Sequence, residues 1–435
     1  MERGACPAGA PVVDYFDHNS HAYADHRYEW YEAIRGSVGP VFWSPHHGGF
    51  WVVIGYDEVQ QALRDWETYS SRHVIDEQGQ GVTVDGVRYD GLFLPPRPYA
   101  NKMLEEDPPE CRVSRNILIR SFAPAAVEKW RGRVQDLVDA CIDRRIASGQ
   151  IDFAADLSNI VPAIFSLEFV GVPTDHFEFV AFSSHKMTHT AATDPEWQEV
   201  AKAREVEAVR IREAIEHRRL GARGPDIISV LLDAMDRGEP ITEEDVFKLA
   251  RLVITAGIDT TSATLASAFI TLTKMPELKR RLAEDPSLLA KSFQEFVRMS
   301  APTQGLCRTV TRDTGLGGQS LRRGDRVMLC YAAACRDPQR FQAPDTVILD
   351  RNPNAHLGFG NGQHRCLGSG FAQLEFEVIL STVLRRLPDF RVDLDAVESF
   401  ANVGVVAGYV KVPASFTPGT RLGVDPRVPG WNPER

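Results

Sequence analysis

The feature that most constrains the fold is a run of 22 residues, Leu252 to Thr273, in which Asp259 is the only charged residue. Its length and hydropathy alone would allow a membrane span. The run contains six threonines and two serines, however, and it has neither a basic flank bias nor a belt of aromatic residues. A helix that is apolar on most faces is otherwise buried in a large domain. The run therefore predicts a long central helix in a globular protein.

This predicted helix carries an acid beside an alcohol, within the segment Ala256 to Thr261. Thr260 can donate a hydrogen bond back to a helical carbonyl and open the helix locally. Asp259 and Thr260 together are suited to proton delivery. The alternative, that the hydroxyl groups only fill core space, suits Thr264 and Thr271 better than Asp259, because an unpaired buried carboxylate is costly.

A second informative segment, Phe359 to Gly368, is a glycine-containing loop that carries Cys366. Gly360 and Gly362 can adopt dihedrals closed to other residues, so the backbone can approach a flat ligand closely. Apolar residues follow at helical spacing from Leu367 onward, which places the cysteine at a helix N-terminus. Free amide groups and the helix dipole favour an anionic sulfur there, and we expect a lowered pKa. Such a thiolate is suited to bind a metal, and the alternative is an inert buried cysteine.

The loop resembles the haem-binding signature of the cytochrome P-450 family, Phe-x-x-Gly-x-[Arg or His]-x-Cys-x-Gly, with Phe359, Gly362, His364, Cys366 and Gly368 at its fixed positions. The resemblance implies a mainly α fold with a smaller β portion. It also implies haem b, iron protoporphyrin IX, between the long central helix and the helix of the cysteine loop, with Cys366 as the axial ligand of the iron. The other haem-contacting residues would be Phe359, Gly360, Gly368 and Ala372 on the cysteine side and Ala256 and Gly257 on the central helix.

Two further motifs support the resemblance. Glu295 and Arg298 share a helical face at i, i+3 spacing and match the family's structural Glu-x-x-Arg pair, which anchors the segment leading into the cysteine loop. The segment Asp107 to Arg115 resembles Asp-Pro-Pro-Glu-His-x-x-x-Arg, whose His and Arg hold haem propionates. Cys111 stands at the His position, and since a thiol is a weak donor, we expect that contact to be lost or replaced by water.

Four basic residues stand where the family places donors to the haem propionates: Arg115, Arg308, His356 and His364. Each taken alone could be an ordinary surface cation. The resemblance implies that together they hold the two carboxylates.

Composition and the chain ends suggest a cytoplasmic enzyme of the bacterial type. The net charge of −10 does not favour a nucleic-acid partner, and the segment Met1 to Pro7 has none of the apolar character of membrane-tethered family members. Seven cysteines without paired spacing fit a reducing compartment. We expect a single domain over residues 1–435, with loose tails at about 1–12 and 424–435, and no membrane association.

The secondary structure is expected to be mostly helical. A β-hairpin is predicted from Val41–Ser44 and Phe50–Ile54, and by resemblance the long loop from Ser70 to Asp107 covers the substrate pocket. The predicted helices span 56–64, 124–145, 158–169, 175–189 and 196–219, with a further helix starting after a Thr242 cap.

The substrate is expected to be a largely hydrophobic small molecule without a charged anchor, in bacterial secondary metabolism. By position, seven apolar residues could line its pocket, although each is equally well explained as core: Leu92, Phe93, Leu94, Val253, Leu306, Val405 and Val406.

The resemblance implies a monooxygenase that uses O2, with Asp259 and Thr260 supplying protons. No flavin or iron–sulfur domain fits in the remaining sequence, so electrons would come from a ferredoxin and its reductase, docked near Arg112, Arg120 and Arg365. Two alternatives stay open. One is a haem-thiolate enzyme that performs oxidative coupling or rearrangement or uses peroxide, and the other is a non-catalytic haem sensor.

Overall fold

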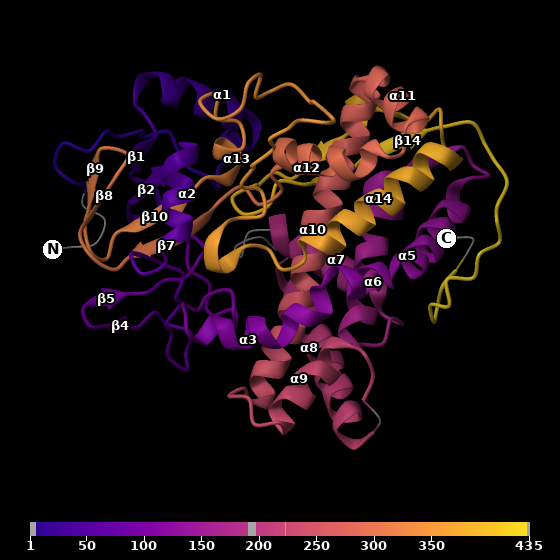
Figure 1. Cartoon of the computed structure of the whole chain (residues 1–435), viewed down its shortest axis with the longest axis horizontal. Coiled ribbons are helices and arrows are strands. Elements are labelled where there is room, and N and C mark those ends of the chain that lie inside the picture. The colour runs from indigo at the N-terminus through magenta and orange to yellow at the C-terminus, as the bar shows by residue number, and fades with distance from the viewer. Residues whose placement is uncertain (1–5, 190–196, 222, 433–435) are drawn as a thin grey trace.

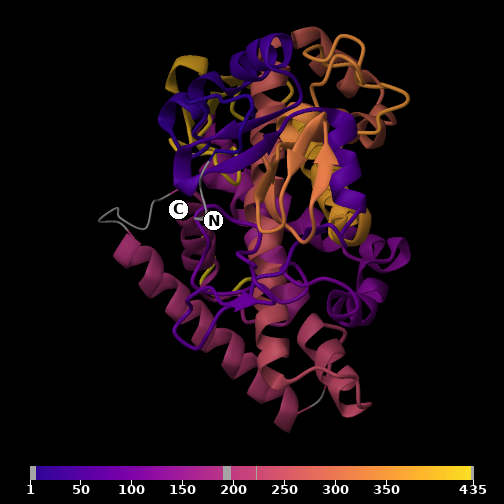
Figure 2. The same cartoon turned by 90° about the vertical axis from the view of Figure 1, so that its left-hand side faces the viewer.

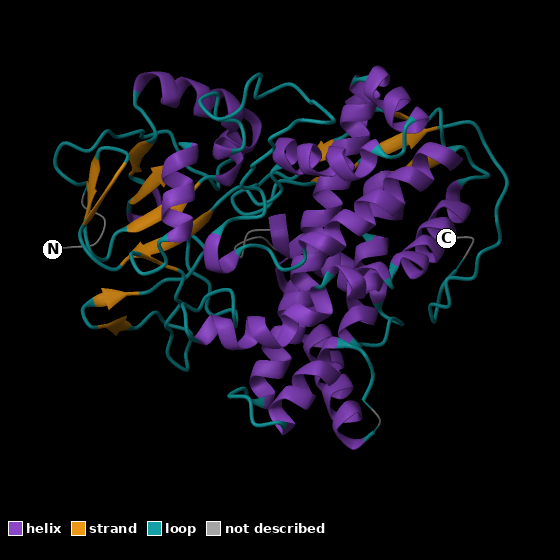
Figure 3. Cartoon of the chain, in the orientation of Figure 1, coloured by secondary structure: helices purple, strands orange, loops and turns teal. Residues whose placement is uncertain are grey.

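The computed structural model describes residues 6–189, 197–221 and 223–432. Helices are its main element. Most strands gather at one side, although a few lie among the helices on the other, as Figure 3 shows. The first described segment of the chain lies at the strand-rich side and the last at the helical side (Figure 1). The predicted mainly α fold with a smaller β portion is confirmed.

The helices, in chain order, are α1 His21–Ser37, α2 Tyr56–Arg64, α3 Glu110–Leu118, α4 Pro124–Glu128, α5 Arg131–Arg145, α6 Ile160–Val170, α7 Phe177–His189, α8 Trp197–Leu220, α9 Ile227–Asp236, α10 Glu243–Lys274, α11 Pro276–Glu284, α12 Leu288–Ser300, α13 Tyr331–Ala334 and α14 Ser369–Arg386. The strands are β1 Val41–Ser44, β2 Phe50–Val53, β3 Tyr69–Ser70, β4 Thr83–Val84, β5 Val87–Arg88, β6 Gln150–Asp152, β7 Leu306–Val310, β8 Thr314–Leu316, β9 Gln319–Leu321, β10 Arg326–Leu329, β11 Arg391–Val392, β12 Glu398–Ser399, β13 Tyr409–Lys411 and β14 Pro413–Ser415.

The largest sheet has five strands in the order β1-β2-β10-β7-β3. The predicted hairpin forms its edge, with Trp43 of β1 opposite Trp51 of β2 in antiparallel register. Strand β10 adds to β2 in parallel and to β7 in antiparallel orientation. This sheet and helices α1 and α2 share one hydrophobic cluster, while the long helices share a second, larger one.

Helix α10 is the predicted central helix, and it runs the length of the helical portion (Figure 2). Its N-terminus is fixed by a capping box, in which Thr242 and Asp245 each bond the other's backbone N–H. By length and composition alone, α10 and the segment Phe153–Val170 could each cross a membrane. Their apolar windows are 67% and 83% buried inside the protein, however, which is typical of core helices.

Several helix boundaries differ from the predicted ones for local reasons. The predicted helix 124–145 is divided into α4 and α5, and α4 begins at Pro124, where the missing N–H costs nothing. Helix α6 follows a π-helical segment, Phe153–Ser158, that is capped by the Asp152 carboxylate. Helix α7 begins at Phe177. Residue 196, the predicted start of the next helix, lies outside the described residues, and α8 is described from Trp197.

Residues near both chain ends form specific contacts. Near the N-terminus, Trp43 donates its backbone N–H to the Pro11 carbonyl oxygen at 2.8 Å. Near the C-terminus, Val428 is buried, and the Arg144 guanidinium lies 3.7 Å from the ring centroid of Trp431. Pro11, Val428 and Trp431 therefore contact the rest of the chain, while the expectation of loose tails over about 1–12 and 424–435 stays a prediction. Residues 1–5 and 433–435 lie outside the described residues.

Candidate active site

A cavity of about 540 Å³ lies between α10 and the loop that carries Cys366. This volume is typical of a site for a small molecule or cofactor. Residues of both hydrophobic clusters line the cavity. The predicted site residues that line it are Leu92, Phe93, Arg115, Val253, Ala256, Gly257, Asp259, Thr260, Leu306, Arg308, Phe359, Gly360, His364, Cys366, Gly368, Ala372, Val405 and Val406.

The cysteine loop is folded back on itself. The backbone N–H of Cys366 donates to the Phe359 carbonyl oxygen at 2.9 Å, which closes the loop. Gly360 and Gly362 have φ of 64° and 68°, a region that favours glycine. A Cβ at Gly362 would also collide with the carbonyl oxygen of Leu63, so the loop can lie against α2 only with glycine at that position.

The position of Cys366 differs slightly from the predicted one. Helix α14 begins at Ser369 with Gly368 as its N-cap, so the cysteine precedes the helix by three residues. Burial raises the pKa of the Cys366 thiol, and this effect outweighs the opposing effects of the Gly368 backbone N–H and of Arg365 and Arg115. The expected lowering of this pKa is therefore wrong for the protein alone, because desolvation is larger than the effect of the helix end. A bound metal ion would still deprotonate the thiol.

His364 supplies the observation that tests whether a carboxylate-bearing cofactor fits the cavity. Its Nε2 is buried and has no hydrogen-bond partner in the part of the chain that the structure describes. Two guanidinium groups line the same cavity, those of Arg308, which is 3% exposed, and of Arg115. Burial, followed by these two charges, lowers the pKa of His364 to about 3. A ligand carboxylate would neutralise the two cations, and its negative charge would favour a proton on the orphaned Nε2 and accept that proton's hydrogen bond, so these residues fit a haem propionate.

Two residues that were expected in the cavity, His356 and Leu94, do not line it. The Nε2 of His356 lies 2.9 Å from Gln294 Oε1, and its Nδ1 accepts the Gly358 N–H at 3.2 Å. The expected propionate contact of His356 is therefore not supported, because both ring nitrogens have protein partners. Leu94 is likewise not a lining residue, since its side chain packs in the cluster around the five-stranded sheet while its carbonyl accepts from Asn19.

On α10, the acid and the alcohol both line the cavity. The Thr260 hydroxyl donates to the Ala256 carbonyl oxygen at 3.1 Å, as the sequence predicts. The neighbouring Asp259 is 5% exposed, and its Oδ1 lies 3.6 Å from Nδ1 of His185 on α7. Sequence reasoning missed His185, because no motif connects α7 with α10. A Cβ at Gly257 would lie 2.7 Å from the Ser166 hydroxyl, so this glycine also permits α6 to pack closely on α10.

The cavity lining contains more acidic and basic residues than the sequence predicted. Its lining includes six acidic or basic residues that sequence reasoning missed: Arg97, Arg204, Glu244, Lys248, Arg251 and Glu375. The guanidinium of Arg97 stacks 3.6 Å from the ring centroid of Phe93, so one cation adjoins the apolar wall. Lys248 and Arg251 lie on α10 in the turn that directly precedes the apolar run. Their position beside this run is the sequence signal that could have indicated charged residues in the cavity.

Cys111 also lines the cavity, from the first turn of α3. It is 2% exposed, and burial, followed by the Asp107 and Glu106 carboxylates, raises its pKa to about 11. The cavity therefore contains a second thiol, and this thiol is neutral at physiological pH.

Glu295 and Arg298 lie outside the cavity, fully buried on α12. Arg298 Nη1 also donates to the carbonyl oxygens of Cys335 and Pro344, at 2.9 and 2.7 Å. Glu295 accepts the backbone N–H of Ile348 at 2.9 Å. The pair therefore fixes the segment that leads into the cysteine loop, in agreement with its expected structural place.

Comparison with known proteins agrees with this geometry. The family model described as cytochrome P450 matches residues 175–402. The steroid C26-monooxygenase of Mycobacterium tuberculosis is 30% identical over 95% of this chain and 99% of its own length. The mycinamicin IV hydroxylase/epoxidase of Micromonospora griseorubida is 30% identical over 80% of this chain and 85% of its own length.

Solved structures show the same fold. The crystal structure of CYP108D1 from Novosphingobium aromaticivorans has a TM-score of 0.78 and 26% identity, covering 93% of this chain and 99% of that one. The structure of CYP109E1 from Bacillus megaterium in complex with testosterone has a TM-score of 0.79 at 24% identity, with coverage of 91% and 99%.

Proposed function

The chain belongs to the cytochrome P450 family, and we propose on that premise that it is a haem-thiolate monooxygenase that inserts one atom of O2 into a largely hydrophobic small molecule. One observation carries the proposal: a single cavity is lined by Cys366 and by the Asp259 and Thr260 pair. The acid and the alcohol beside the cysteine favour oxygen activation, because that reaction requires proton delivery. Peroxide use, oxidative coupling and a sensor role do not require these two side chains.

We propose haem b as the cofactor, with Cys366 as its axial ligand. His364, Arg115 and Arg308 would hold the propionates, because their polar groups line the cavity and the His364 Nε2 lacks a partner among the described residues. Phe359, Gly360, Gly368 and Ala372 would contact the haem from one side, and Ala256 and Gly257 from α10. When bound, haem supplies one-electron and oxygen chemistry that side chains lack, and a thiolate ligand promotes O–O cleavage.

The residues of α10 would move the protons. The Thr260 hydroxyl is anchored on the Ala256 carbonyl, so its oxygen lone pairs remain available to accept a proton or to bind water in the cavity. Asp259 would deliver protons to it from a buried position, and His185 would hold the Asp259 carboxylate in place. The apolar wall would keep bulk water out.

The substrate-binding wall would consist of six apolar lining residues: Leu92, Phe93, Val253, Leu306, Val405 and Val406. Two relatives are named for steroid and mycinamicin oxidation, which supports a bulky hydrophobic substrate of secondary metabolism. A screen of steroids, terpenoids, macrolides and fatty acids by the spin-state change of the ferric haem tests this. We expect neutral hydrophobic compounds to respond. A response confined to highly charged compounds would contradict the proposal.

A ferredoxin and its reductase would supply the electrons. Arg112, Arg120 and Arg365 are exposed, and Arg112 Nε donates to Gln363 Oε1 in the cysteine loop at 3.2 Å. We expect Arg112→Glu and Arg365→Glu to slow haem reduction by ferredoxin without changing substrate affinity, because long-range charge attraction steers such partners. Arg391→Glu, at the exposed position of strand β11, is the matched control. Unchanged reduction rates in the first two variants would contradict the proposed docking face.

We infer that residues 1–435 act as one domain in the reducing cytoplasm. The cavity requires residues of both hydrophobic clusters, from Leu63 to Val406, which supports a single functional unit. All seven cysteines are free, which supports a reducing compartment.

A further inference from the structure

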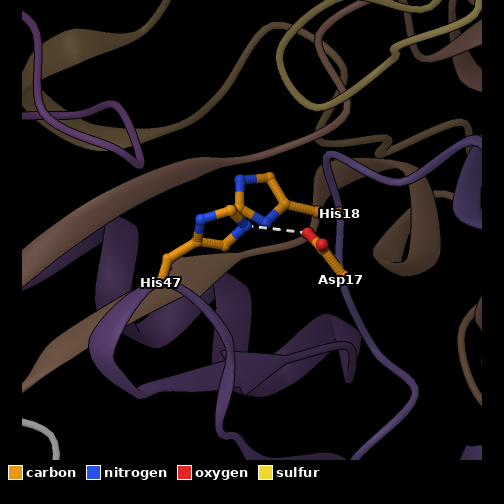
Figure 4. Close-up of side chains that lie close together, drawn as sticks. All are labelled: Asp17, His18 and His47. Atoms are coloured by element: carbon orange, nitrogen blue, oxygen red, sulfur yellow. Dashed lines mark hydrogen bonds and ion pairs between the residues drawn. The ribbon is translucent and has the colours of Figure 1, made fainter.

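A cluster of three metal-ligating side chains lies outside the active-site cavity. It consists of Asp17 and His18, which precede α1, and His47, in the turn between β1 and β2. Figure 4 shows the two imidazole rings and the carboxylate gathered at one point. One possible ligand atom from each residue lies within 4.8 Å of the other two, and Asp17 Oδ1 is 2.7 Å from His47 Nε2.

His18 has an unused ring nitrogen at this point. The residue is 2% exposed, and its Nε2 lies 3.1 Å from the carbonyl oxygen of Leu94. The Asn19 amide also lies 3.3 Å from this Nε2, but its shorter bond, 2.9 Å, goes to the same Leu94 carbonyl. Because that carbonyl can only accept, we assign the His18 proton to Nε2, which leaves the Nδ1 lone pair free. That Nδ1 is buried and has no hydrogen-bond partner among the residues the structure describes. A buried acceptor without a partner is costly, and a cation would satisfy it.

The other two ligands are accessible to an incoming ion. The side chains of Asp17 and His47 are 25% and 23% exposed. His46 Nδ1 lies 4.0 Å from Asp17 Oδ2, and its Nε2 is 2.7 Å from the Asp14 carbonyl oxygen. The same tautomer argument therefore leaves the His46 Nδ1 lone pair free. His46 or a water molecule could complete a fourth position.

We propose that Asp17, His18 and His47 form a binding site for a divalent transition-metal ion, with Zn²⁺ as the best match. Two neutral imidazole nitrogens and one carboxylate oxygen are a typical zinc donor set. His47 Nε2 donates to Asp17 Oδ1, so zinc would bind this nitrogen with release of its proton. Mg²⁺ and Ca²⁺ prefer oxygen ligands throughout, so the two histidines disfavour them. The Leu94 carbonyl that fixes the His18 tautomer is the kind of outer partner that metal-binding histidines usually have.

The proposed ion would be structural. It would join the segment before α1 to the β1–β2 turn. The Leu94 carbonyl accepts from both His18 and Asn19, and Leu94 directly follows Phe93, which lines the active-site cavity. Zinc should therefore stabilise the strand-rich side of the molecule and one end of the loop that forms the cavity wall.

Isothermal titration calorimetry of the chelator-treated, dialysed holoenzyme with Zn²⁺ tests the proposal. We expect one ion per chain, and no binding heat with Mg²⁺ or Ca²⁺. His47→Asn and Asp17→Asn should weaken zinc binding at least about tenfold. Asparagine suits position 47, because His47 has φ of 51° and asparagine tolerates that region. His26→Asn removes another exposed histidine–carboxylate pair, His26 with Glu29, and should leave the affinity unchanged.

A second readout does not depend on heat. Zinc should raise the thermal unfolding midpoint of the wild-type protein and of His26→Asn, but not that of Asp17→Asn, because only binding to the folded state stabilises it. The proposal is overturned if the wild type binds no stoichiometric zinc, or if Asp17→Asn and His47→Asn bind it as tightly as the wild type.

Discussion

Arg298 donates two hydrogen bonds to the carboxylate of Glu295, each 2.8 Å long, and both side chains are fully buried. Removing Arg298 takes away both of these bonds and leaves Arg351, whose Nε lies 3.1 Å from Glu295 Oε2, as the cation beside the buried carboxylate. We therefore expect Arg298→Met to lower the free energy of unfolding by about 3 kcal/mol, as measured by guanidinium titration of the holoenzyme.

The exposed ion pairs of Arg280 with Glu277 and Glu284 on α11 provide the control. Arg280→Met should have a much smaller effect, since solvent screens exposed pairs. Equal losses of stability in the two variants would contradict the structural role of the buried pair.

Thr260→Ala should uncouple electron use from product formation. The substitution removes the hydroxyl that is anchored on the Ala256 carbonyl and leaves cavity water without its proton relay. We expect electrons to be diverted to peroxide, measured as hydrogen peroxide and product formed per NAD(P)H consumed. Thr260→Ser keeps the hydroxyl and should remain coupled. Full coupling in the alanine variant would count against the relay.

Asp259→Asn should slow turnover by about 100-fold, because it removes the acid that we propose delivers protons. His185→Gln should lower kcat to a smaller extent and leave KM unchanged, because His185 holds Asp259 without lining the cavity. Steady-state kinetics with a substrate from the spin-state screen would measure both. A rise in KM with unchanged kcat for His185→Gln would point instead to a role in substrate binding.

His356 should make the folded state sensitive to acid. Burial lowers its pKa from 6.5 to about 4, so below pH 6.5 the unfolded chain binds a proton that the folded protein excludes. The free energy of unfolding therefore falls as pH falls from about 6.5 to about 4, and the full loss is roughly 3 kcal/mol. His356→Gln should reduce this loss by that amount, as seen in unfolding free energies at pH 7 and pH 4. Parallel pH curves for the two proteins would refute the assignment.

The sequence predicted the features that depend on local chemistry. The apolar run and the Thr242 cap predicted α10, and the glycines of the cysteine loop predicted its positive φ angles, because these properties depend on neighbouring residues. The family resemblance then indicated which residues would meet, and nearly all of the predicted lining residues do line one cavity.

The predictions that differ from the structure concern residues whose contacts and burial depend on partners distant in the sequence. His356 does not face the cavity with a free ring nitrogen, because Gln294 and Gly358 bond both of its nitrogens. Leu94 packs in the hydrophobic cluster around the five-stranded sheet. The direction of the Cys366 pKa shift depends on total burial, which a helix-end argument does not include. His185 meets Asp259 only because α7 packs on α10.

The central claim is that the Cys366 sulfur is the ligand of a haem iron in this cavity, and the ferrous carbon monoxide spectrum tests it most directly. The Soret position of that spectrum reports thiolate ligation. Cys111 is the matched control, because it is the second thiol that lines the same cavity. We predict a thiolate-type Soret band for the wild-type protein and for Cys111→Ser, and its loss in Cys366→Ser. A thiolate-type band that persists in Cys366→Ser, or that disappears in Cys111→Ser, would contradict the account.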